Sequence, residues 1–283
     1  MRIVAGIDVG TAFTKAVIVS DCVSNARPLV VGRGWTRTGV DMEGAARRAF
    51  EVALEEAQLE PSEVCYIATS GFGRYGVGFR DIQITEITSG ARGAHYLFPD
   101  ATAVLDIGSQ STRAMSLYEN GKVRGFKTND KCAAGSGSFI VRAAKYLQIG
   151  IGEAGELALR ATNPQPISSV CAVLAESEII NHVSAGVGVE DILRGIYDSL
   201  ADRSAMLLKR VNPGHSLVFI GGLAHQRGMV KALEDRLGLS VHVPEQCEYV
   251  CALGAALLGL KRIEAGSRAD IAYRHSIVAC EPN

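Results

Sequence analysis

Apolar and polar residues follow one another along the chain as short apolar runs and longer helical patterns. Residues 3–8 and 14–20 are apolar runs joined by a glycine-containing turn, which predicts two buried strands. Residues 41–58 place apolar side chains at helical spacing and stop before Pro61, which predicts a helix. Further strands are expected around Val30, Gly32 and Trp35 and over residues 64–69 and 217–220, and further helices over residues 87–98, 135–147, 173–184, 191–211, 226–237 and 248–263. No element is assigned from Gly266 onward.

The opening strand–turn–strand pattern returns about a third of the way along the chain. A second apolar strand, Val104-Leu-Asp-Ile-Gly, runs into a turn and then into residues 111–118. Several pairs of like residues share one offset of 98 positions, and this indicates a duplicated unit. The pairs are Asp8 and Asp106, Gly10 and Gly108, Thr14 and Thr112, Lys15 and Arg113, and Ala16 and Ala114.

Composition narrows the class of protein. The chain has 283 residues, of which 47% are hydrophobic and 21% charged, as in soluble globular proteins of two compact units. Lys plus Arg (29) and Asp plus Glu (30) nearly cancel, so we expect no nucleic-acid partner. The longest apolar stretches, such as residues 252–260, are shorter than the roughly 20 residues of a membrane span, and the first residues show no signal-peptide pattern. We therefore expect a cytoplasmic protein without membrane contact, and the odd count of 7 Cys argues against a disulfide framework.

The two repeated turns carry the first candidate chemistry. A glycine turn exposes backbone N–H groups that bind anions, and two such turns could hold a chain of phosphates from both sides. Asp8 and Asp106 would end adjacent central strands, where one or two carboxylates suit Mg²⁺ on a phosphate substrate. Thr11, Thr14 and Lys15 add donors near the first turn. The alternative is a pair of ordinary β-turns with solvated carboxylates.

Two other glycine segments need separate interpretations. Gly221 and Gly222 follow an apolar strand and precede a helix, where glycine permits close approach of a flat ligand such as adenine or its ribose. A simple strand-to-helix turn explains the same pair. The segment from Gly71 to Gly76 spells GxGxxG, but no convincing helix and no suitably spaced acidic residue follow, so a dinucleotide site is not expected. No GxxxxGK[ST] segment is present, so a Walker-type NTPase is unsupported.

Cys132 and Cys171 each stand directly before a predicted helix. Unpaired N–H groups and the positive end of the helix dipole favour a thiolate at such a position, and they also suit an anionic iron–sulfur cluster. Two cysteines cannot complete a four-cysteine site, whereas two chains around a twofold axis can. Two buried or redox-inert cysteines are the alternative.

Three motifs together resemble a known superfamily. GIDVGTAFTKAVI, LDIGSQSTRAMSL and FIGGLAHQRG resemble the first phosphate, second phosphate and adenosine motifs of the acetate kinase, sugar kinase, heat-shock ATPase and actin superfamily. The resemblance implies an α/β fold of two duplicated actin/ribonuclease H-like domains with an ATP cleft between them. The expected domains are residues 1–103 plus 255–283, and residues 104–254, which carry the two cysteines.

A longer resemblance points to one branch of that superfamily. NDKCAAGSGSF, CAVLAESEIINHVSAGV, DILRGI and TEITSGARGAHYLFP resemble the ATPase components of 2-hydroxyacyl-CoA dehydratases and of ATP-dependent benzoyl-CoA reductases, and the similarity runs from about residue 3 to about residue 262. It implies a [4Fe–4S] cluster held by Cys132 and Cys171 of two chains, with Zn²⁺ as the minor alternative. The family's His after Glu86 is absent, because Ser89 and Gly90 stand there.

The resemblance also implies site residues. Gln110 matches a Gln that could orient the attacking water, beside Ser109 at the second phosphate turn, and Glu86 could reach Mg²⁺ through water. Asp8 and Asp106 would serve Mg–ATP. The remaining cysteines are interpreted as packing residues: Cys22, Cys65, Cys247, Cys251 and Cys280.

The expected function is therefore ATP-hydrolysing electron transfer. A ferredoxin or flavodoxin would donate the electron, a second identical or related ATPase subunit would share the cluster, and catalytic acyl-CoA reductase or dehydratase subunits would accept the electron. A benzoyl-CoA reductase-type subunit is favoured over a 2-hydroxyacyl-CoA dehydratase activator. A small-molecule kinase, a chaperone-like ATPase and a zinc-bridged nucleotide-binding dimer stay as alternatives of other classes.

Overall fold

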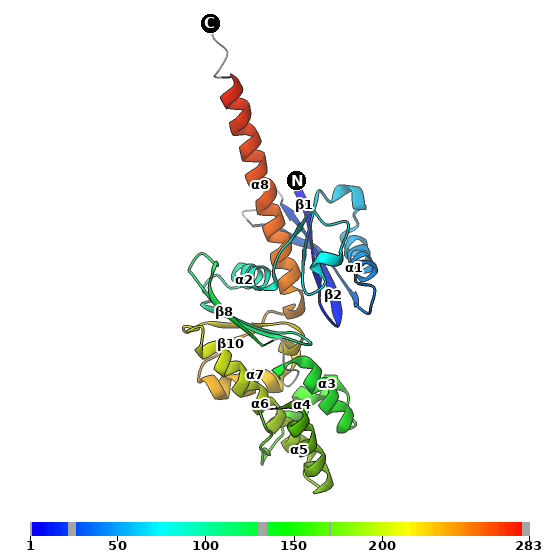
Figure 1. Cartoon of the computed structure of the whole chain (residues 1–283), viewed down its shortest axis with the longest axis vertical. Helices are drawn as coiled ribbons and strands as arrows, with labels where there is room; N and C mark the ends of the chain where they lie inside the picture. Colours follow the sequence, from blue (N-terminus) through cyan, green and yellow to red (C-terminus); the bar gives the residue numbers. More distant parts are fainter. Residues whose placement is uncertain (1, 22–26, 130–134, 170, 279–283) are drawn as a thin grey trace. The chain divides into compact units, whose positions relative to one another are not determined.

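The computed structural model describes residues 2–21, 27–129, 135–169 and 171–278, with side chains as far as residue 266. The chain divides into two compact units, Met1–Gly93 with Cys251–Asn283 as unit 1 and Ala94–Val250 as unit 2. Each unit is built on a five-stranded sheet with helices (Figure 1). None of the helices in these described ranges is both long enough and apolar enough to cross a membrane.

The sheet of unit 1 has the spatial order β3-β2-β1-β4-β5. Its strands are β1 (Arg2–Val9), β2 (Phe13–Asp21), β3 (Leu29–Arg37), β4 (Tyr66–Ser70) and β5 (Ile82–Gln83). The first three strands form an antiparallel meander, whereas β4 and β5 run parallel to β1. Strand β1 is buried along nearly its whole length, as its continuous apolar sequence predicts for a central strand.

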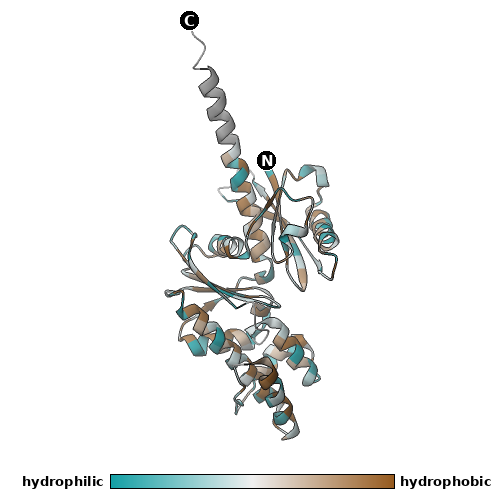
Figure 2. Cartoon of the chain, viewed as in Figure 1, coloured by the Kyte–Doolittle hydropathy of each residue, from teal (hydrophilic) through white to brown (hydrophobic). Residues whose placement is uncertain are grey.

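Helices cover this sheet through small residues. They are α1 (Met42–Ala57), α2 (Glu86–Leu97) and α8 (Val250–Val278), with short 3₁₀ turns η1 (Pro61–Glu63) and η2 (Arg74–Gly76). Alternate residues of β1, such as Ile7, pack in one core cluster with Ala49 and Ala53 of α1. Gly6 lies between these β1 residues and faces the other side of the sheet. It meets α8 so closely that a Cβ there would lie 2.0 Å from the carbonyl oxygen of Ala252. Figure 2 shows the hydrophobic first part of α8 in tan and brown.

The sheet of unit 2 repeats the strand order of unit 1. Its spatial order is β10-β9-β6-β7-β8. Its strands are β6 (Ala103–Ile107), β7 (Thr112–Leu117), β8 (Val123–Asn129), β9 (Leu217–Ile220) and β10 (Val241–His242). Antiparallel and parallel pairings also repeat, with β6-β7-β8 antiparallel and β9 and β10 parallel to β6 and to each other. This repetition confirms the predicted α/β class and the duplicated pattern.

A larger helical layer distinguishes unit 2. Its helices are α3 (Gly137–Tyr146), α4 (Ile151–Ala158), α5 (Ala172–Ser184), α6 (Val189–Lys209) and α7 (Arg227–Leu237), with 3₁₀ turns η4 (Gly222–His225) and η5 (Cys247–Tyr249). They share one hydrophobic core with alternate residues of the sheet, in which Phe139, Tyr197 and Phe219 are fully buried. Burial raises the pKa of Tyr197 far above its ordinary value, and its hydroxyl donates to Gln226 at 3.0 Å.

Most predicted elements are present within one to three residues of their expected ends. The strands and α-helices not predicted are β8, whose residues are mostly exposed and show no clear alternation, the two-residue strands β5 and β10, and α4, which is only 8 residues long. The prediction also stopped the last helix too early, because α8 continues to Val278 through a segment that contains no proline.

Candidate functional site

The first hairpin turn holds a buried carboxylate. Asp8 is 8% exposed near the end of β1, directly opposite Lys15 on β2, and its Oδ2 lies 3.6 Å from Lys15 Nζ. The N–H of Gly10 donates to the carbonyl of Phe13 at 3.2 Å, which closes the turn. The structure therefore places the predicted Asp8, Gly10 and Lys15 at one edge of the sheet of unit 1.

Threonines brace this turn from the side of β3. The Thr38 hydroxyl donates to the carbonyl of Gly10 at 2.7 Å and lies 2.9 Å from the hydroxyl oxygen of Thr14. Thr14 is fully buried, so its hydroxyl is occupied inside the protein, whereas Thr11 is half-buried at the turn. Of the two predicted donors Thr11 and Thr14, only Thr11 has a side chain that a ligand could reach.

The second hairpin turn repeats the first with tighter geometry. Asp106 is 4% exposed near the end of β6, opposite Arg113 on β7, and its Oδ2 accepts from Arg113 Nη1 at 2.9 Å. The N–H of Gly108 donates to the carbonyl of Ser111 at 2.9 Å, the same turn bond as in unit 1. Gln110 is exposed at this turn and Ser109 is half-buried. The predicted Asp106, Gly108, Ser109 and Gln110 thus share one edge of unit 2.

A glycine with positive φ follows the neighbouring parallel strand in each unit. Gly71 (φ +89°) comes after Ser70, which pairs with Asp8, and Gly221 (φ +88°) comes after Ile220, which pairs with Asp106. A Cβ at Gly221 would lie 2.6 Å from Asp106 Oδ1, so only glycine fits there. A Cβ at Gly222 would meet no atom within 4 Å, which leaves open space at the predicted adenosine segment.

Arg74 is a further residue beside the site that the sequence pattern did not indicate, because it lies within the GxGxxG segment that was not expected to bind a ligand. Arg74 Nη1 donates to the carbonyl of Gly71 at 2.8 Å and to Glu86 Oε2 at 3.0 Å. The predicted Mg²⁺-side carboxylate Glu86 is therefore ion-paired and only 15% exposed. The signal that could have found Arg74 is the match between Gly71 and Gly221, each the first residue after a parallel strand.

The N-terminus of α3 is hydrogen-bonded directly to the second turn. The N–H of Gly137 donates to the carbonyl of Gly108 at 2.9 Å, and the N–H of Ser138 donates to the carbonyl of Ser109 at 2.8 Å. The hydroxyl of Thr112 on β7 also donates to the carbonyl of Gly135. The start of α3 is thus hydrogen-bonded both to the turn between β6 and β7 and to β7 itself.

Helix α3 is tied in turn to α5. Arg142 Nε donates to Glu176 Oε1 at 2.8 Å, and the Tyr146 hydroxyl donates to Glu176 Oε2 at 3.3 Å. Helix α5 begins directly after Cys171, which is its N-cap residue. A continuous series of contacts inside unit 2 therefore leads from the second turn to Cys171.

The surroundings of Cys171 favour the thiolate form of its side chain. The backbone N–H groups of Leu174 and Val173 stabilise the thiolate, and Arg203 adds a positive charge, so the pKa of Cys171 lies below that of an ordinary cysteine. The residue is half-buried, which leaves its sulfur within reach of a ligand. Its predicted partner Cys132 lies outside the described residues.

The other cysteines divide into two kinds. Cys247 and Cys251 are buried, in agreement with packing, and burial raises the pKa of Cys247 to about 12. Cys65 was wrongly predicted to pack, because it is exposed on the approach to β4, where its thiol donates to the carbonyl of Ile3 at 3.0 Å. Cys22 and Cys280 lie outside the described residues.

Comparison with known proteins decides the family. Residues 5–259 match the BadF/BadG/BcrA/BcrD ATPase family. The chain belongs to this family. The match covers both units and every site residue described above.

Characterised relatives within the ATPase family are similar over nearly their whole length. The chain is 40% identical to a benzoyl-CoA reductase subunit of Thauera aromatica over 95% of this chain and 96% of that protein. It is 36% identical to the (R)-2-hydroxyglutaryl-CoA dehydratase activating ATPase of Acidaminococcus fermentans, over 91% and 96%. The predicted resemblance to this branch is confirmed.

Comparison with solved structures shows that this chain has the actin-like ATPase fold. The Acidaminococcus fermentans (R)-2-hydroxyglutaryl-CoA dehydratase component A superposes with a TM-score of 0.87 at 35% identity, over 93% of this chain and 99% of that one. The Clostridium difficile 2-hydroxyisocaproyl-CoA dehydratase activator with bound ADPNP gives the same TM-score at 31% identity, over 95% and 98%. A ROK hexokinase from Thermus thermophilus, at 15% identity and a TM-score of 0.51, shares the fold alone.

Proposed function

We propose that this protein is the ATP-hydrolysing, iron–sulfur electron-transfer component of an acyl-CoA-converting enzyme of the benzoyl-CoA reductase type. One observation carries the proposal, the hydrogen-bonded series from the Gly108–Ser109 turn through α3 to the helix that begins after Cys171. A nucleotide at the turn and a metal centre at Cys171 would be joined by one set of contacts. The 40% identity to the Thauera aromatica benzoyl-CoA reductase subunit favours this type of enzyme.

The nucleotide half of the proposal rests on the two hairpin turns. Membership of an ATPase family and the ADPNP bound to a relative of 31% identity support ATP as the ligand. Asp8 and Asp106 would serve Mg²⁺, and the exposed Gln110 would orient the attacking water. The remaining nucleotide-binding residues would be Gly10, Thr11, Lys15, Glu86, Gly108, Ser109, Gly221 and Gly222. The predicted Thr14 is fully buried and its hydroxyl lies 2.9 Å from that of Thr38, so it supports the first turn and does not face the ligand.

The electron-transfer half rests on Cys171. Its stabilised thiolate and partial exposure fit an iron–sulfur ligand, and Cys132 and Cys171 from each of two chains would supply four thiolates. A bound [4Fe–4S] cluster supplies one-electron redox chemistry. Ferredoxin or flavodoxin would be the donor, and acyl-CoA reductase or dehydratase catalytic subunits would be the acceptor. Zn²⁺ in the same thiolates is the competing assignment.

Exposed apolar side chains on α5 support a second chain at Cys171. Val173 and Leu174, in the first turn of α5, are 69% and 54% exposed, and Ile180 and Val183 further along are 49% and 46% exposed. Such a group is unusual on a solvated surface and typical of an interface. A second copy, or a related ATPase subunit, packed there would bring its own pair of cysteines to the same place.

Iron and acid-labile sulfide analysis of anaerobically purified protein tests the proposal. We expect one [4Fe–4S] cluster per two chains in the wild type and none in Cys171→Ser, which loses a required thiolate. ADPNP affinity should change less than about twofold, because Cys171 lies outside the turns. Cys251→Ser, which removes a buried cysteine, is the matched control and should keep the cluster. Wild-type protein that stays free of iron after anaerobic reconstitution would falsify the proposal.

A 2-hydroxyacyl-CoA dehydratase activator is the second candidate. The chain is 38% identical to the activator of lactoyl-CoA dehydratase of Anaerotignum propionicum, over 89% of this chain and 95% of that protein. Both candidates use the same nucleotide and cluster residues, so the catalytic partner distinguishes them. Purification of the native complex with identification of every subunit decides between a reductase and a dehydratase.

A further inference from the structure

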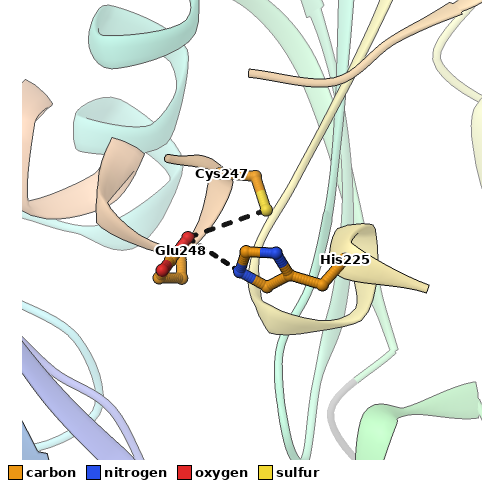
Figure 3. Close-up of side chains that lie close together, drawn as sticks. All are labelled: His225, Cys247 and Glu248. Atoms are coloured by element: carbon orange, nitrogen blue, oxygen red, sulfur yellow. Dashed lines mark hydrogen bonds and ion pairs between the residues drawn. The ribbon is translucent and has the colours of Figure 1, made fainter. Parts of the chain in front are cut away.

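A group of side chains that could hold a metal ion lies in unit 2 and does not include Cys171. His225 ends η4, and Cys247 and Glu248 begin η5. Figure 3 shows the imidazole, thiol and carboxylate turned toward one another. His225 Nε2 lies 2.8 Å from Glu248 Oε2, and Cys247 Sγ lies 3.8 Å from the same oxygen. One ligand atom from each of the three residues lies within 4.8 Å of the other two.

These separations are close to those around a tetrahedral metal ion. Zn–S bonds of about 2.3 Å and Zn–N or Zn–O bonds of about 2.0 Å place neighbouring ligand atoms roughly 3.3–3.5 Å apart in a tetrahedron. The His225–Glu248 distance has to open by about half an ångström and the Cys247–Glu248 distance has to close by less. The His225–Cys247 pair lies within 4.8 Å and has to close by at most about 1.3 Å, which rotation of the two side chains can supply.

The backbone holds the three residues in place. The N–H of Gly221, just before η4, donates to the carbonyl of Cys247 at 3.0 Å, so η4 and η5 are joined directly. Gln226, next to His225, accepts from Tyr197 and donates to the carbonyl of Ile151. A preformed set of ligands loses little conformational entropy when a metal binds.

We propose that His225, Cys247 and Glu248 form a mononuclear site for Zn²⁺, separate from the cysteines assigned to the cluster. One sulfur, one nitrogen and one carboxylate ligand suit this borderline-soft ion and not Mg²⁺, which takes oxygen ligands. On binding, the S–H bond of Cys247 breaks, its proton goes to solvent, and a metal–sulfur bond forms. The two anionic ligands then balance the charge of the ion. His225 is 49% exposed, which leaves the fourth position to a water molecule.

The test uses the full chain with Cys132→Ser and Cys171→Ser, so that the cluster ligands cannot contribute. This double variant, stripped of metal with a chelator, is titrated with Co²⁺ as a spectroscopic probe. We expect one Co²⁺ per chain with a thiolate-to-cobalt charge-transfer band, which Zn²⁺ then removes by displacement. Absence of the band at saturation would overturn the proposal.

Single substitutions in the same background assign the ligands. Cys247→Ser should abolish the band, while Cys251→Ser, the matched buried cysteine, should leave the band and the Zn²⁺ affinity unchanged. His225→Gln and Glu248→Gln should each weaken Zn²⁺ binding at least about tenfold, and both test the site if Cys247→Ser does not fold. A band that persists in Cys247→Ser, or unchanged affinity in both glutamine variants, contradicts the site. None of these results depends on whether the wild-type chain carries an iron–sulfur cluster.

Discussion

The two hairpin turns have one plan and two different supports. Each has an aspartate opposite a cation, a glycine N–H that closes the turn, and a glycine with positive φ after the neighbouring strand. In unit 1 the turn is held by Thr38, a residue of the same sheet region. In unit 2 it is held by the N-terminus of α3, and α3 leads on to α5 and Cys171.

This difference separates what the two units share from what the second unit adds. The aspartate, the cation and the two glycines form a common framework, which we propose binds phosphate. The helical layer of unit 2 connects that framework to Cys171, and the described part of unit 1 contains no comparable series of helix contacts. The comparison can be tested at each of its components.

The glycines after the parallel strands should give the largest effect. In Gly221→Ala a methyl group would lie 2.6 Å from Asp106 Oδ1 in a left-handed conformation, and in Gly71→Ala it would lie 2.4 Å from the carbonyl oxygen of Val9. We expect each to lower the free energy of unfolding of its own unit by about 3 kcal/mol or more, measured by denaturant titration. Gly222→Ala, which meets open space, should change it by less than about 0.5 kcal/mol. If Gly71→Ala left the free energy of unfolding unchanged while Gly221→Ala lowered it, the two glycines would not have equivalent roles.

Removal of the ion pairs at the two aspartates should have the next largest effect on stability, and the effect should be larger in unit 2 than in unit 1. Arg113→Met removes a 2.9 Å pair with a carboxylate that is 6% exposed, and we expect a loss of about 3 kcal/mol. Lys15→Met removes a 3.6 Å pair whose carboxylate is 12% exposed, so a loss of about 1 kcal/mol is expected. Denaturant titration without nucleotide measures the free energy of unfolding of both variants. The double variant Asp106→Asn/Arg113→Met, which removes both charges of the pair, is the control. Equal losses of unfolding free energy in the two variants would mean that the shorter ion pair of unit 2 contributes no more to stability than the longer pair of unit 1.

The contact between α3 and α5 should have the smallest effect on stability and a clear effect on coupling. Glu176→Ala removes a partly exposed pair, which contributes less than about 1 kcal/mol. In iron-free protein, we expect a non-hydrolysable ATP analogue to change the alkylation rate of Cys171, followed by peptide mass spectrometry, by several-fold in the wild type. The change should fall below about twofold in Glu176→Ala and persist in Glu156→Ala, which removes a surface pair elsewhere in unit 2. An undiminished response in Glu176→Ala would show that α5 does not respond to nucleotide through this contact.

Much of the fold could be predicted because its central strands are uniformly apolar and its repeat keeps one offset. Asp8 and Asp106 were found from that offset, and the structure places both beside their matching cations. The edge strand β8 was missed, since exposed residues carry little hydrophobic pattern.

The site was harder to predict where it depends on contacts between distant residues. No local pattern shows that Arg74 pairs with Glu86, that Thr38 occupies the hydroxyl of Thr14, or that His225 meets Glu248. These contacts follow from strand pairing and helix packing, which bring together residues that are far apart along the chain. The chemistry of Cys171 could be predicted because the start of its helix is local.

The hydrogen bonds at the start of α3 also decide which groups of unit 2 can bind an anion. The first N–H groups of a helix ordinarily point outward and attract phosphate. Here the amides of Gly137, Ser138 and Phe139 already donate to the carbonyls of Gly108, Ser109 and Ser136. The first amides of α3 are therefore closed to incoming oxyanions, so an anion at this turn would be bound by other groups, among them the hydroxyl of Ser109 and the carboxamide of Gln110.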